Sequence, residues 1–349
     1  MKPREFHPEG VSSILVVRLY FIGDVLLSTP VLNALKTTFP GARLSVLIKK
    51  RARQVLEANP FVDEVIEYDA VPRYHSAPWL LSLAARLRRA RYDLAVDLTG
   101  DLRSSWLLVA ADPAFRVGFN HAGFGFLLDR RIPYRSRGHV VEHLLGSVAC
   151  VGASPADPMP RMYLTAGERA RARALLASRG VPERAQFVAL SPGANWEFRR
   201  WPADRFGQLA ALARERHGLV SVVTGSSSDA SLADAVVSAS DGAAVTIAGL
   251  TDVRALAAVA GHARAFVGND SGPVHVAASQ GTPVLGLFGP GTPERFAPRG
   301  ASSRILWARY PCSPCDQRRC RRPDDPCMEA LRVADAGSAL DELLGEAGP

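Results

Sequence analysis

Residues 263–291, ARAFVGNDSGPVHVAASQGTPVLGLFGPG, decide the fold. Ala265–Val267 predicts a short buried strand, 268–272 a turn, Pro273–Gln280 a helix and Val284–Phe288 the next strand. A strand that leads through a glycine turn into a helix presents unpaired backbone N–H groups and the positive end of the helix dipole at one point. That point suits a phosphate or diphosphate. The alternative is an ordinary βαβ turn, in which the glycines only reverse the chain.

The same alternation of strand and helix extends through both halves of the chain. In the first half, strands are expected at Ser13–Arg18, Arg43–Ile48, Glu64–Tyr68 and Leu94–Leu98, with helices at Val25–Thr38, Arg51–Asn59 and Trp79–Ala90. In the second half, strands are expected at Phe187–Ser191, Val220–Thr224 and Val245–Ala248, with helices at Gly167–Arg179, Ala203–His217, Ala230–Ser240 and Asp252–Gly261. Pro30 predicts a kink or a late start in its helix. The pattern predicts an α/β fold with two Rossmann-like doubly wound domains facing a cleft.

The boundary between the two expected domains falls in a stretch of weaker periodicity. Residues 99–165 are less regular than their flanks, and Ala153–Pro160 is polar and rich in proline, as linkers are. We therefore expect one domain over 1–160 and a second over 161–349, the second ending in a cysteine-rich tail.

Composition restricts the class of protein. The chain has 349 residues, 47% of them apolar, which suffices for two domains, and its formal charge is +8. With a pI of about 9.6, the partner or its surroundings are expected to be anionic (phosphate, nucleic acid or a membrane surface), unless the charge merely solvates one face. The sequence shows no long apolar run and no apolar leader at its start, so we expect a cytoplasmic protein without a membrane span.

Asp24 is the strongest candidate for a catalytic residue. It follows Gly23 just beyond the first expected strand, where a helix begins. An aspartate at such a place commonly caps the helix. It can instead act as a general base for a substrate bound at this edge of the sheet.

A second candidate lies in 192–202, PGANWEFRRWP, where Arg199 and Arg200 follow a glycine turn. Arginine there suits a bidentate grip on a diphosphate, and surface arginines beside a packed tryptophan are the alternative. Because ligands of such sheets bind at the carboxyl ends of the strands, we expect four stretches to surround one crevice. They are Gly23-Asp24, Pro192–Arg200, Gly225–Asp229 and Gly268–His275.

The irregular stretch carries many basic residues, which are Arg103, Arg116, His121, Arg130, Arg131, Arg135, Arg137, His139 and His143. They form either a solvated face or a basic wall for an anionic acceptor.

Four cysteines follow near the end of the chain, as Cys312-x2-Cys315-x4-Cys320-x6-Cys327. They could hold zinc or an iron–sulfur cluster, but the later spacings are not those of a common zinc module, so a cluster of reduced thiols is the favoured interpretation. The sequence contains no Asp-x-Asp triplet, which favours neutralisation of a nucleotide by arginine rather than by a carboxylate-held Mg²⁺. It also lacks the GxxxxGK[ST] loop of nucleoside triphosphatases and the GxSxG elbow of serine hydrolases.

Three stretches taken in order resemble glycosyltransferase family 9, the ADP-heptose:lipopolysaccharide heptosyltransferases. ILVVRLYFIGDVLLSTPVLNALKTTFPGARLSVLIKKR is similar to the family's N-terminal signature, SPGANWEFRRWP to its inter-domain motif, and FVGNDSGPVHVAASQGTPVLGLFGP to its donor-site motif. The cysteine-rich tail is similar to that of the heptosyltransferase III branch.

The resemblance implies a GT-B fold, with the acceptor in the first domain and the nucleotide sugar in the second. It implies inverting, metal-independent transfer of heptose from ADP-heptose to a lipopolysaccharide inner-core acceptor, without a cofactor, at the inner face of the inner membrane. Asp24 matches the catalytic aspartate. The matching donor-binding positions are Asn195, Arg199, Asp229, Leu250, Thr251, Asp270, Ser271, Gly272 and His275. For the acceptor, the basic wall offers Arg116, His121, Arg135 and His139.

The chain departs from the family pattern at three of these positions. Arg199 stands where lysine is usual, which keeps the charge and changes the geometry of the grip. Asn195 replaces a small hydroxyl residue, and Asp229 lacks the usual glutamate-rich run. Two other functions stay open on the residues alone: transfer of a different nucleotide sugar to another surface glycan, and non-catalytic binding of a nucleotide or nucleic acid. No basic recognition helix or stacking platform supports nucleic acid as a partner.

Overall fold

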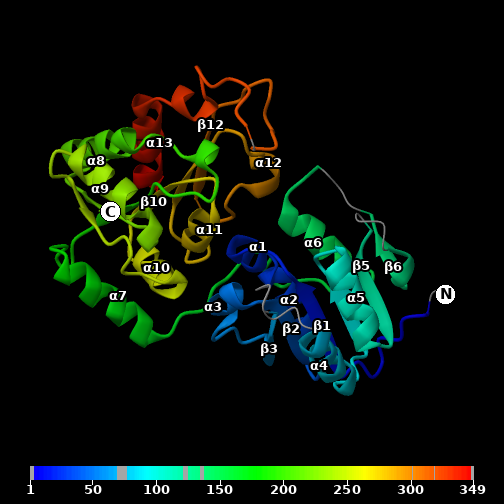
Figure 1. Ribbon diagram of the computed structural model, residues 1–349. Helices are drawn as coiled ribbons and strands as arrows, with labels where there is room; N and C mark the ends of the chain where they lie inside the picture. Colours follow the sequence, from blue (N-terminus) through cyan, green and yellow to red (C-terminus); the bar gives the residue numbers. More distant parts are fainter. Residues whose placement is uncertain are drawn as a thin grey trace. The chain divides into compact units, whose positions relative to one another are not determined.

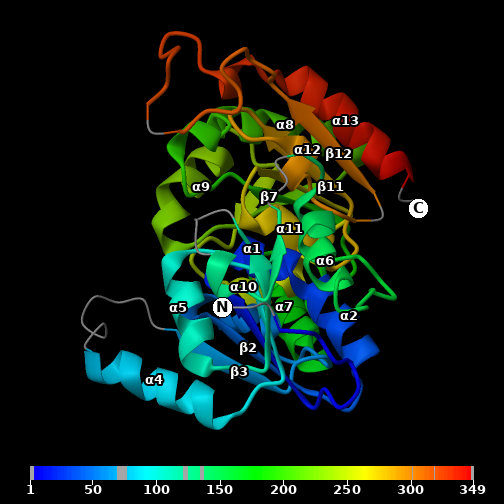
Figure 2. The same cartoon turned by 90° about the vertical axis from the view of Figure 1, so that its right-hand side faces the viewer.

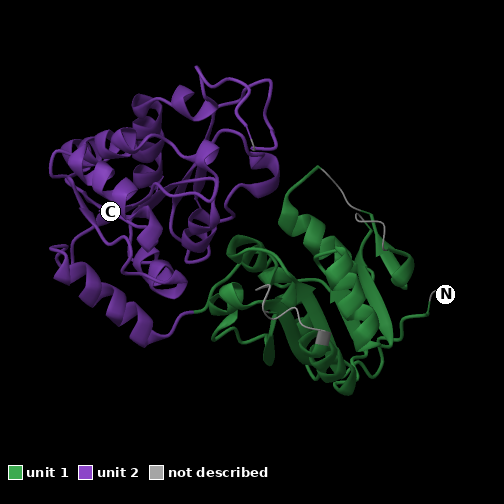
Figure 3. Cartoon of the chain, in the orientation of Figure 1, with its two compact units in different colours: residues 1–163 green, residues 164–349 purple. Residues whose placement is uncertain are grey.

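The structure is a computed structural model that describes residues 4–68, 77–120, 125–133, 137–300, 302–317 and 319–346. The chain divides into two compact units, residues 1–163 and 164–349 (Figure 3). Each unit has its own six-stranded sheet and its own hydrophobic core, so each is described by itself.

The first unit is built on a parallel sheet with the strand order β3-β2-β1-β4-β5-β6 (Figure 1). Its strands are β1 Ser13–Arg18, β2 Arg43–Lys49, β3 Glu64–Tyr68, β4 Leu94–Asp97, β5 Phe115–Phe119 and β6 Arg130–Ile132. In β1 every residue after Ser13 is buried, which explains its unbroken apolar run ILVV. Strand order reverses between β1 and β4, so the loops that follow these two strands diverge there.

Helices cover both faces of this sheet. They are α1 Ile22–Leu27, α2 Thr29–Thr38, α3 Arg53–Leu56, α4 Ala77–Arg89, α5 Leu102–Ala111 and α6 Val140–Ala149, with short 3-10 turns η1 Lys50–Ala52 and η3 Gly125–Leu127. α4 packs beside α5, and α2 packs beside α6 (Figures 1 and 2). The connection that contains α2 and those that contain α4 and α5 run in opposite directions along the sheet, so right-handed crossovers put them on opposite faces. α6 follows the last strand and packs against α2.

Two expectations for the first unit are corrected. The stretch 99–165 is not irregular, because it contains α5, β5, β6 and α6. Basic residues, some exposed and some buried, interrupt the apolar pattern and conceal these elements. The helix expected over 25–38 is two helices: α1 ends at Leu27, and α2 begins at Thr29 with Pro30 in its first turn, where a missing N–H costs no hydrogen bond. The first of these two helices also begins earlier than expected, because residues 22–24 form the first turn of α1.

The second unit has the order β12-β11-β10-β7-β8-β9, which is the same winding as in the first unit. Its strands are β7 Phe187–Ser191, β8 Val220–Val223, β9 Ala244–Thr246, β10 Ala265–Asn269, β11 Val284–Phe288 and β12 Ser303–Trp307. All of their pairings are parallel. The expected α/β class with two doubly wound sheets is confirmed.

The helices of the second unit also form two layers. They are α7 Ala166–Ser178, α8 Ala203–His217, α9 Ala230–Ser238, α10 Val253–Ala260, α11 Gly272–Ala278, α12 Pro293–Phe296 and α13 Val333–Glu346, with 3-10 turns η4 Glu197–Arg199, η5 Ser227–Asp229 and η6 Cys327–Ala330. One core lies between the sheet and α8, α9 and α13. The other lies between the sheet and α7, α10 and α11.

One fully buried amide joins two loops of the second unit. The side chain of Asn269, at the end of β10, accepts from the backbone N–H of Trp201 at 3.0 Å and donates to the carbonyl of Pro192 at 2.7 Å. The indole of Trp201 is itself buried and donates to Leu331 O at 2.9 Å.

We expect Asn269→Ala to lower the free energy of unfolding by about 2–4 kcal/mol, because it leaves two buried backbone groups without their partner. Asn33→Ala, on α2 with a single side-chain partner in Thr37, should change it by less than about 0.5 kcal/mol. Urea denaturation of both variants measures the difference, and equal losses would contradict a joining role for Asn269.

Candidate active site

Asp24 lies at the switch point of the first sheet, in the first turn of α1. Its Oδ2 accepts from the backbone N–H of Phe21 at 3.2 Å, so the carboxylate does cap the helix. Its Oδ1 lies 3.4 Å from Nη2 of Arg18, and 28% of the side chain remains exposed. Capping and a role as base are therefore compatible, because the cap occupies one oxygen and the other faces an arginine at the solvent-accessible edge.

Arg18 and the loop after β4 hold this turn in place. Arg18 is 5% exposed, and its guanidinium donates to the carbonyls of Leu98 and Asp24. Thr99 Oγ1 accepts from the backbone N–H of Leu19 at 2.8 Å. These bonds tie the loop that carries Asp24 to the neighbouring loop.

Asp97 supports that neighbouring loop from inside. Its carboxylate accepts from Thr99 N at 2.8 Å, Gly100 N at 2.9 Å and Ser104 Oγ at 2.8 Å. Burial raises the pKa of Asp97 to about 6, against the opposing effect of these three donors. Arg18, Asp97 and Thr99 were not predicted as site residues. The sequence feature that could have indicated two of them is a charged residue at the end of an apolar strand, Arg18 in β1 and Asp97 in β4.

The raised pKa of Asp97 predicts a pH-dependent stability. Because its pKa is about 6 when folded and near 3.8 when unfolded, the folded state retains a proton that the unfolded state has lost between these values. The contribution is complete below pH 3.8 and is lost as the pH rises through 6. The shift corresponds to about 3 kcal/mol.

Asp97→Asn keeps an oxygen for the two amides and cannot ionise. We therefore expect the unfolding free energy of the wild type to fall relative to that of Asp97→Asn as the pH rises from 4 to 7, as urea titrations at several pH values would show. Parallel curves for the two proteins would contradict the raised pKa.

The expected basic wall is only partly described. His121 and Arg135 lie outside the described residues. Arg116 is buried, and its Nε lies 3.4 Å from the buried carboxylate of Asp129. His139 is the N-cap of α6, where its Nδ1 accepts from Val141 N at 3.2 Å. Arg116 and His139 thus have structural partners inside the unit, and we do not carry these two residues into the proposed site.

The second unit gathers polar residues at its own switch point, between β7 and β10. Arg199, in the loop after β7, donates through Nη1 to the carbonyl of Asp270 at 3.1 Å and lies 3.1 Å from its Oδ2. Its Nε donates to Gln317 Oε1 at 2.5 Å. Arg200 donates to Ala194 O at 2.9–3.1 Å, which closes its own loop. Gln317 had no distinguishing signal in the sequence.

Asp270 is almost completely enclosed. Burial raises its pKa, and the guanidinium of Arg199 opposes that rise. A Cβ on Gly291 would stand 2.1 Å from Asp270 Oδ2, so the loop Gly289-Pro290-Gly291, which follows β11, approaches the carboxylate as closely as only glycine permits. This pair and this loop form the centre of the candidate donor site.

The remaining predicted donor residues lie along the same edge of the sheet. The Asp229 carboxylate accepts from Ser226 N at 2.9 Å and packs against Gly193. Ser271 is the N-cap residue of α11, which starts at Gly272 and buries His275. Asn195 is exposed in the loop after β7.

Leu250 and Thr251 follow β9. Leu250 is 46% exposed. Gly249, with φ of +79°, donates from its N–H to Gly225 O at 2.9 Å, which joins this loop to the one that carries Asp229.

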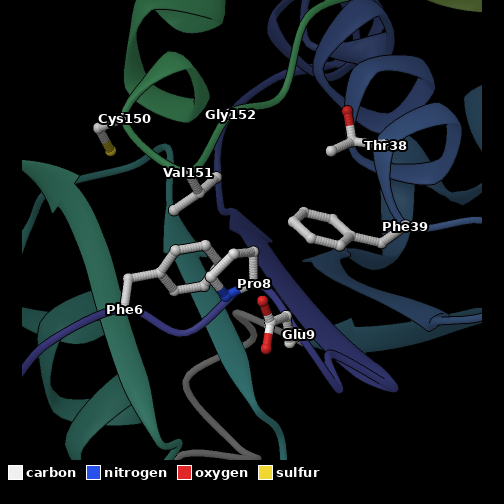
Figure 4. A pocket seen from close by; sticks show the side chains of 8 residues that line it. All are labelled: Phe6, Pro8, Glu9, Thr38, Phe39, Cys150, Val151 and Gly152. Carbon is white, nitrogen blue, oxygen red and sulfur yellow. The ribbon is translucent and has the colours of Figure 1, made fainter.

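Two cavities lie outside these clusters. One, of about 500 Å³, is in the first unit (Figure 4), lined by Phe6, Pro8, Glu9, Thr38, Phe39, Cys150, Val151 and Gly152. None of the predicted site residues lines it, and it lies where α2 and α6 end, towards the amino ends of the strands. The other, of about 660 Å³, is in the second unit beside Arg199, lined by Phe198, Asp316, Arg319, Cys320, Arg321 and Pro323.

The cysteine-rich tail forms the loop between β12 and α13 and its thiols are free. Burial raises the pKa of Cys327, and the thiols of Cys312, Cys315 and Cys320 add to that effect. Among the described side chains, no three His, Cys, Asp or Glu residues are grouped so as to hold a metal ion. The loop is joined to the candidate donor site through Ser313, which donates to Gly289 O at 3.1 Å, and through Gln317.

Within the described parts of the chain, no helix combines the length and the apolar character needed to cross a bilayer.

Two doubly wound units with polar clusters at their switch points define an α/β enzyme architecture with two Rossmann-like halves. Comparison with known proteins gives the family. The model of "Glycosyltransferase family 9 (heptosyltransferase)" matches residues 80–324, and the chain therefore belongs to glycosyltransferase family 9 and is a glycosyltransferase.

The curated and solved relatives agree with the family. Lipopolysaccharide heptosyltransferase 3 of Escherichia coli K12 is 26% identical over 337 residues, 94% of this chain and 96% of that protein. A family 9 glycosyltransferase from Veillonella parvula has the same fold, with a TM-score of 0.87 at 23% identity over 98% of this chain and all of that one. E. coli heptosyltransferase WaaC, solved with ADP-2-deoxy-2-fluoro heptose, has a TM-score of 0.68 at 19% identity over 95% of this chain and 99% of the other. The expected GT-B type of fold is confirmed.

Proposed function

We propose that the protein transfers heptose from ADP-heptose to an acceptor in the lipopolysaccharide inner core. The observation that carries the proposal is the partly exposed carboxylate of Asp24, fixed by Arg18 at the switch point of the first sheet. Family membership supplies the class of reaction. The names of the relatives, a lipopolysaccharide heptosyltransferase and an enzyme complexed with an ADP-heptose analogue, supply the donor and the acceptor class.

In this proposal Asp24 accepts the proton of an acceptor hydroxyl as its oxygen attacks the anomeric carbon. The bond from that carbon to the diphosphate breaks on the opposite face, so the configuration inverts and ADP leaves. The transition state builds up positive charge on the sugar ring and negative charge on the diphosphate. Arg18 keeps the carboxylate oriented before it takes up the proton.

Arg199 and the glycine loops stabilise the leaving diphosphate. The guanidinium already spans Asp270 and Gln317, so its fork is oriented before a ligand arrives. A cation that is already oriented stabilises the transition state more than a mobile one, because it need not reorganise as negative charge develops on the diphosphate. We propose that this arginine, with the backbone amides at Ser271 and Gly272, neutralises the diphosphate without a metal ion, which agrees with a sequence free of Asp-x-Asp.

The nucleoside is proposed to lie along the edge formed by the loops after β8 and β9. Asp229 offers a carboxylate to the ribose hydroxyls, and the exposed Leu250 offers an apolar surface to the base, with Thr251 beside it. On the acceptor side, His121 and Arg135 remain proposed contacts for the phosphates and carboxylates of the inner core. We propose that the enzyme works at the inner face of the inner membrane, where its charge of +8 favours an anionic surface.

The test is transfer from ADP-heptose to a truncated core acceptor, together with a thermal-shift panel of ADP-, GDP-, UDP- and dTDP-sugars. A bound nucleotide sugar raises the melting temperature by mass action. Product formation and a shift confined to ADP sugars are expected. A shift with another nucleotide alone, and no product with ADP-heptose, would favour the second candidate, a family 9 transferase that uses a different nucleotide sugar.

A further inference from the structure

A stripe of large apolar side chains is exposed along one side of α5. Leu102 is 59% exposed, Trp106 41% and Val109 40%. Their spacing of four and then three residues puts them on one face of the helix. The opposite face, with Leu107 and Leu108, is buried against the sheet. We call the exposed stripe of Leu102, Trp106 and Val109 the α5 face.

A cationic cluster lies at the start of the α5 face. Phe21, next to α1, is 48% exposed, and the charged groups of Lys49 and Arg51 lie 5.6 and 4.4 Å from its ring centroid. Arg103 lies at the start of α5, where its Nη2 is 2.7 Å from Oδ2 of Asp101, the N-cap residue. Partial burial lowers the pKa of Lys49, and the charges of Arg51 and Arg103 add to that effect. Arg103 directly follows Leu102, so the cluster adjoins the α5 face.

The other end of the α5 face has the same character. α4 packs beside α5 (Figure 2), and Nη2 of Arg88 lies 3.4 Å from Asp112, the C-cap residue of α5. Leu81, seven residues before Arg88 and on the same face of α4, is 63% exposed. The last turn of α4 also carries Arg86 and Arg89. Apolar side chains thus lie between two groups of basic residues, one with Lys49, Arg51 and Arg103 and the other with Arg86, Arg88 and Arg89.

We propose that the α5 face is the surface with which the enzyme docks on an anionic lipid bilayer. Tryptophan favours the boundary between acyl chains and headgroups, and flanking arginines pair with lipid phosphates. Charge favours a bilayer over a second copy of the chain as the partner of the α5 face. Two α5 faces in contact would bring their basic residues together, and these would repel each other. Each basic residue near an anionic membrane strengthens binding by about five-fold, so several of them around the α5 face would give substantial membrane affinity.

The proposed docking surface rests on the proposed function, because that function places the enzyme at a membrane that carries its acceptor. Phe21 precedes the helix of Asp24 by one residue, so the cationic end of the α5 face lies at the same sheet edge as the candidate base. An acceptor anchored in a membrane by its lipid would then reach Asp24 without leaving the bilayer surface. Vesicle binding needs no sugar transfer, so it fails or succeeds independently of the proposed reaction.

The test is flotation of the full chain with phosphatidylcholine vesicles, with and without phosphatidylglycerol. The wild type should float with the anionic vesicles and only weakly with the neutral ones. The double variant Trp106→Gln and Val109→Gln should bind the anionic vesicles about ten-fold more weakly. Arg103→Gln should bind them about five-fold more weakly.

Matched control variants distinguish a loss of membrane docking from a loss of folding and from a change in the total charge of the protein. Trp106→Phe should retain binding, and it should lose the part of the tryptophan fluorescence that brominated lipid quenches. Arg184→Gln removes an exposed arginine of the second unit and should leave binding unchanged. Unchanged binding in the double variant, with its melting temperature intact, would overturn the proposal. So would sedimentation showing a dimer that the double variant dissociates while vesicles capture neither protein.

Discussion

Asp24→Asn is expected to lower kcat by roughly 10²–10⁴-fold, because it removes the proposed acceptor of the hydroxyl proton and leaves the shape of the turn intact. The asparagine oxygen still accepts from Phe21 N, so α1 keeps its cap. ADP-heptose binding, followed by thermal shift, should be unchanged, because the donor residues belong to the other unit. Single-turnover assays of heptose transfer measure the loss.

Asp101→Asn is the matched control for this experiment. Asp101 is another carboxylate at the same edge of the first sheet, where it is the N-cap of α5 and accepts from Ser104 N at 2.9 Å. Asparagine caps a helix as well as aspartate does. We expect Asp101→Asn to stay close to wild-type activity. If both variants retained full activity, Asp24 would not be the base; if both lost it equally, the loss would reflect negative charge at the edge rather than proton transfer.

Arg199→Met is expected to lower kcat/KM by roughly 10²–10³-fold, the usual cost of removing one preorganised donor from a developing negative charge. The variant also removes the cation that opposes the raised pKa of Asp270, so the buried Asp270 should bind a proton more readily. We therefore expect its activity profile to change with pH, as steady-state rates between pH 6 and pH 9 would show. Loss of the ADP-induced thermal shift should accompany the loss of rate.

Two further variants test the role of the two-sided contact that the Arg199 guanidinium makes with Asp270 and Gln317. Arg199→Lys restores the residue common in the family and keeps the charge, but an ammonium group cannot span Asp270 and Gln317 at once. We expect it to recover part of the lost rate. Gln317→Ala removes one partner of the fork and should raise KM for the donor more than it lowers kcat. A fully active Arg199→Met would remove Arg199 from the donor site.

Most strands were predictable because each is a short, mainly apolar run that ends in a turn. Phe187–Ser191 and Val284–Phe288 agree residue for residue with the prediction, since both are fully buried central strands with unbroken apolar sequence. β5 and β6 were missed because Arg116, Arg130 and Arg131 break that run. Arg116 is buried through its ion pair with Asp129, and that pairing depends on a partner 13 residues away.

The candidate site was predictable residue by residue but not in its contacts. Glycines and an aspartate after strands indicate where a ligand binds, and Asp24 and Asp270 both lie at switch points. The pairing of Arg199 with Gln317 joins residues 118 positions apart, and no local pattern encodes it. The pairing of Arg18 with Asp24 spans six positions, and an arginine that ends an apolar strand gives no sign of where its guanidinium turns.

The division of the chain at Tyr163 and Leu164 interrupts neither a helix nor a strand, and each side keeps a complete sheet and core. Recombination at that junction therefore exchanges whole units, each with its sheet and core intact. In the proposed function, a lineage could replace the half that binds the nucleotide sugar while preserving the half that binds the glycan. The diversity of bacterial surface sugars can then grow by shuffling halves as well as by point substitution.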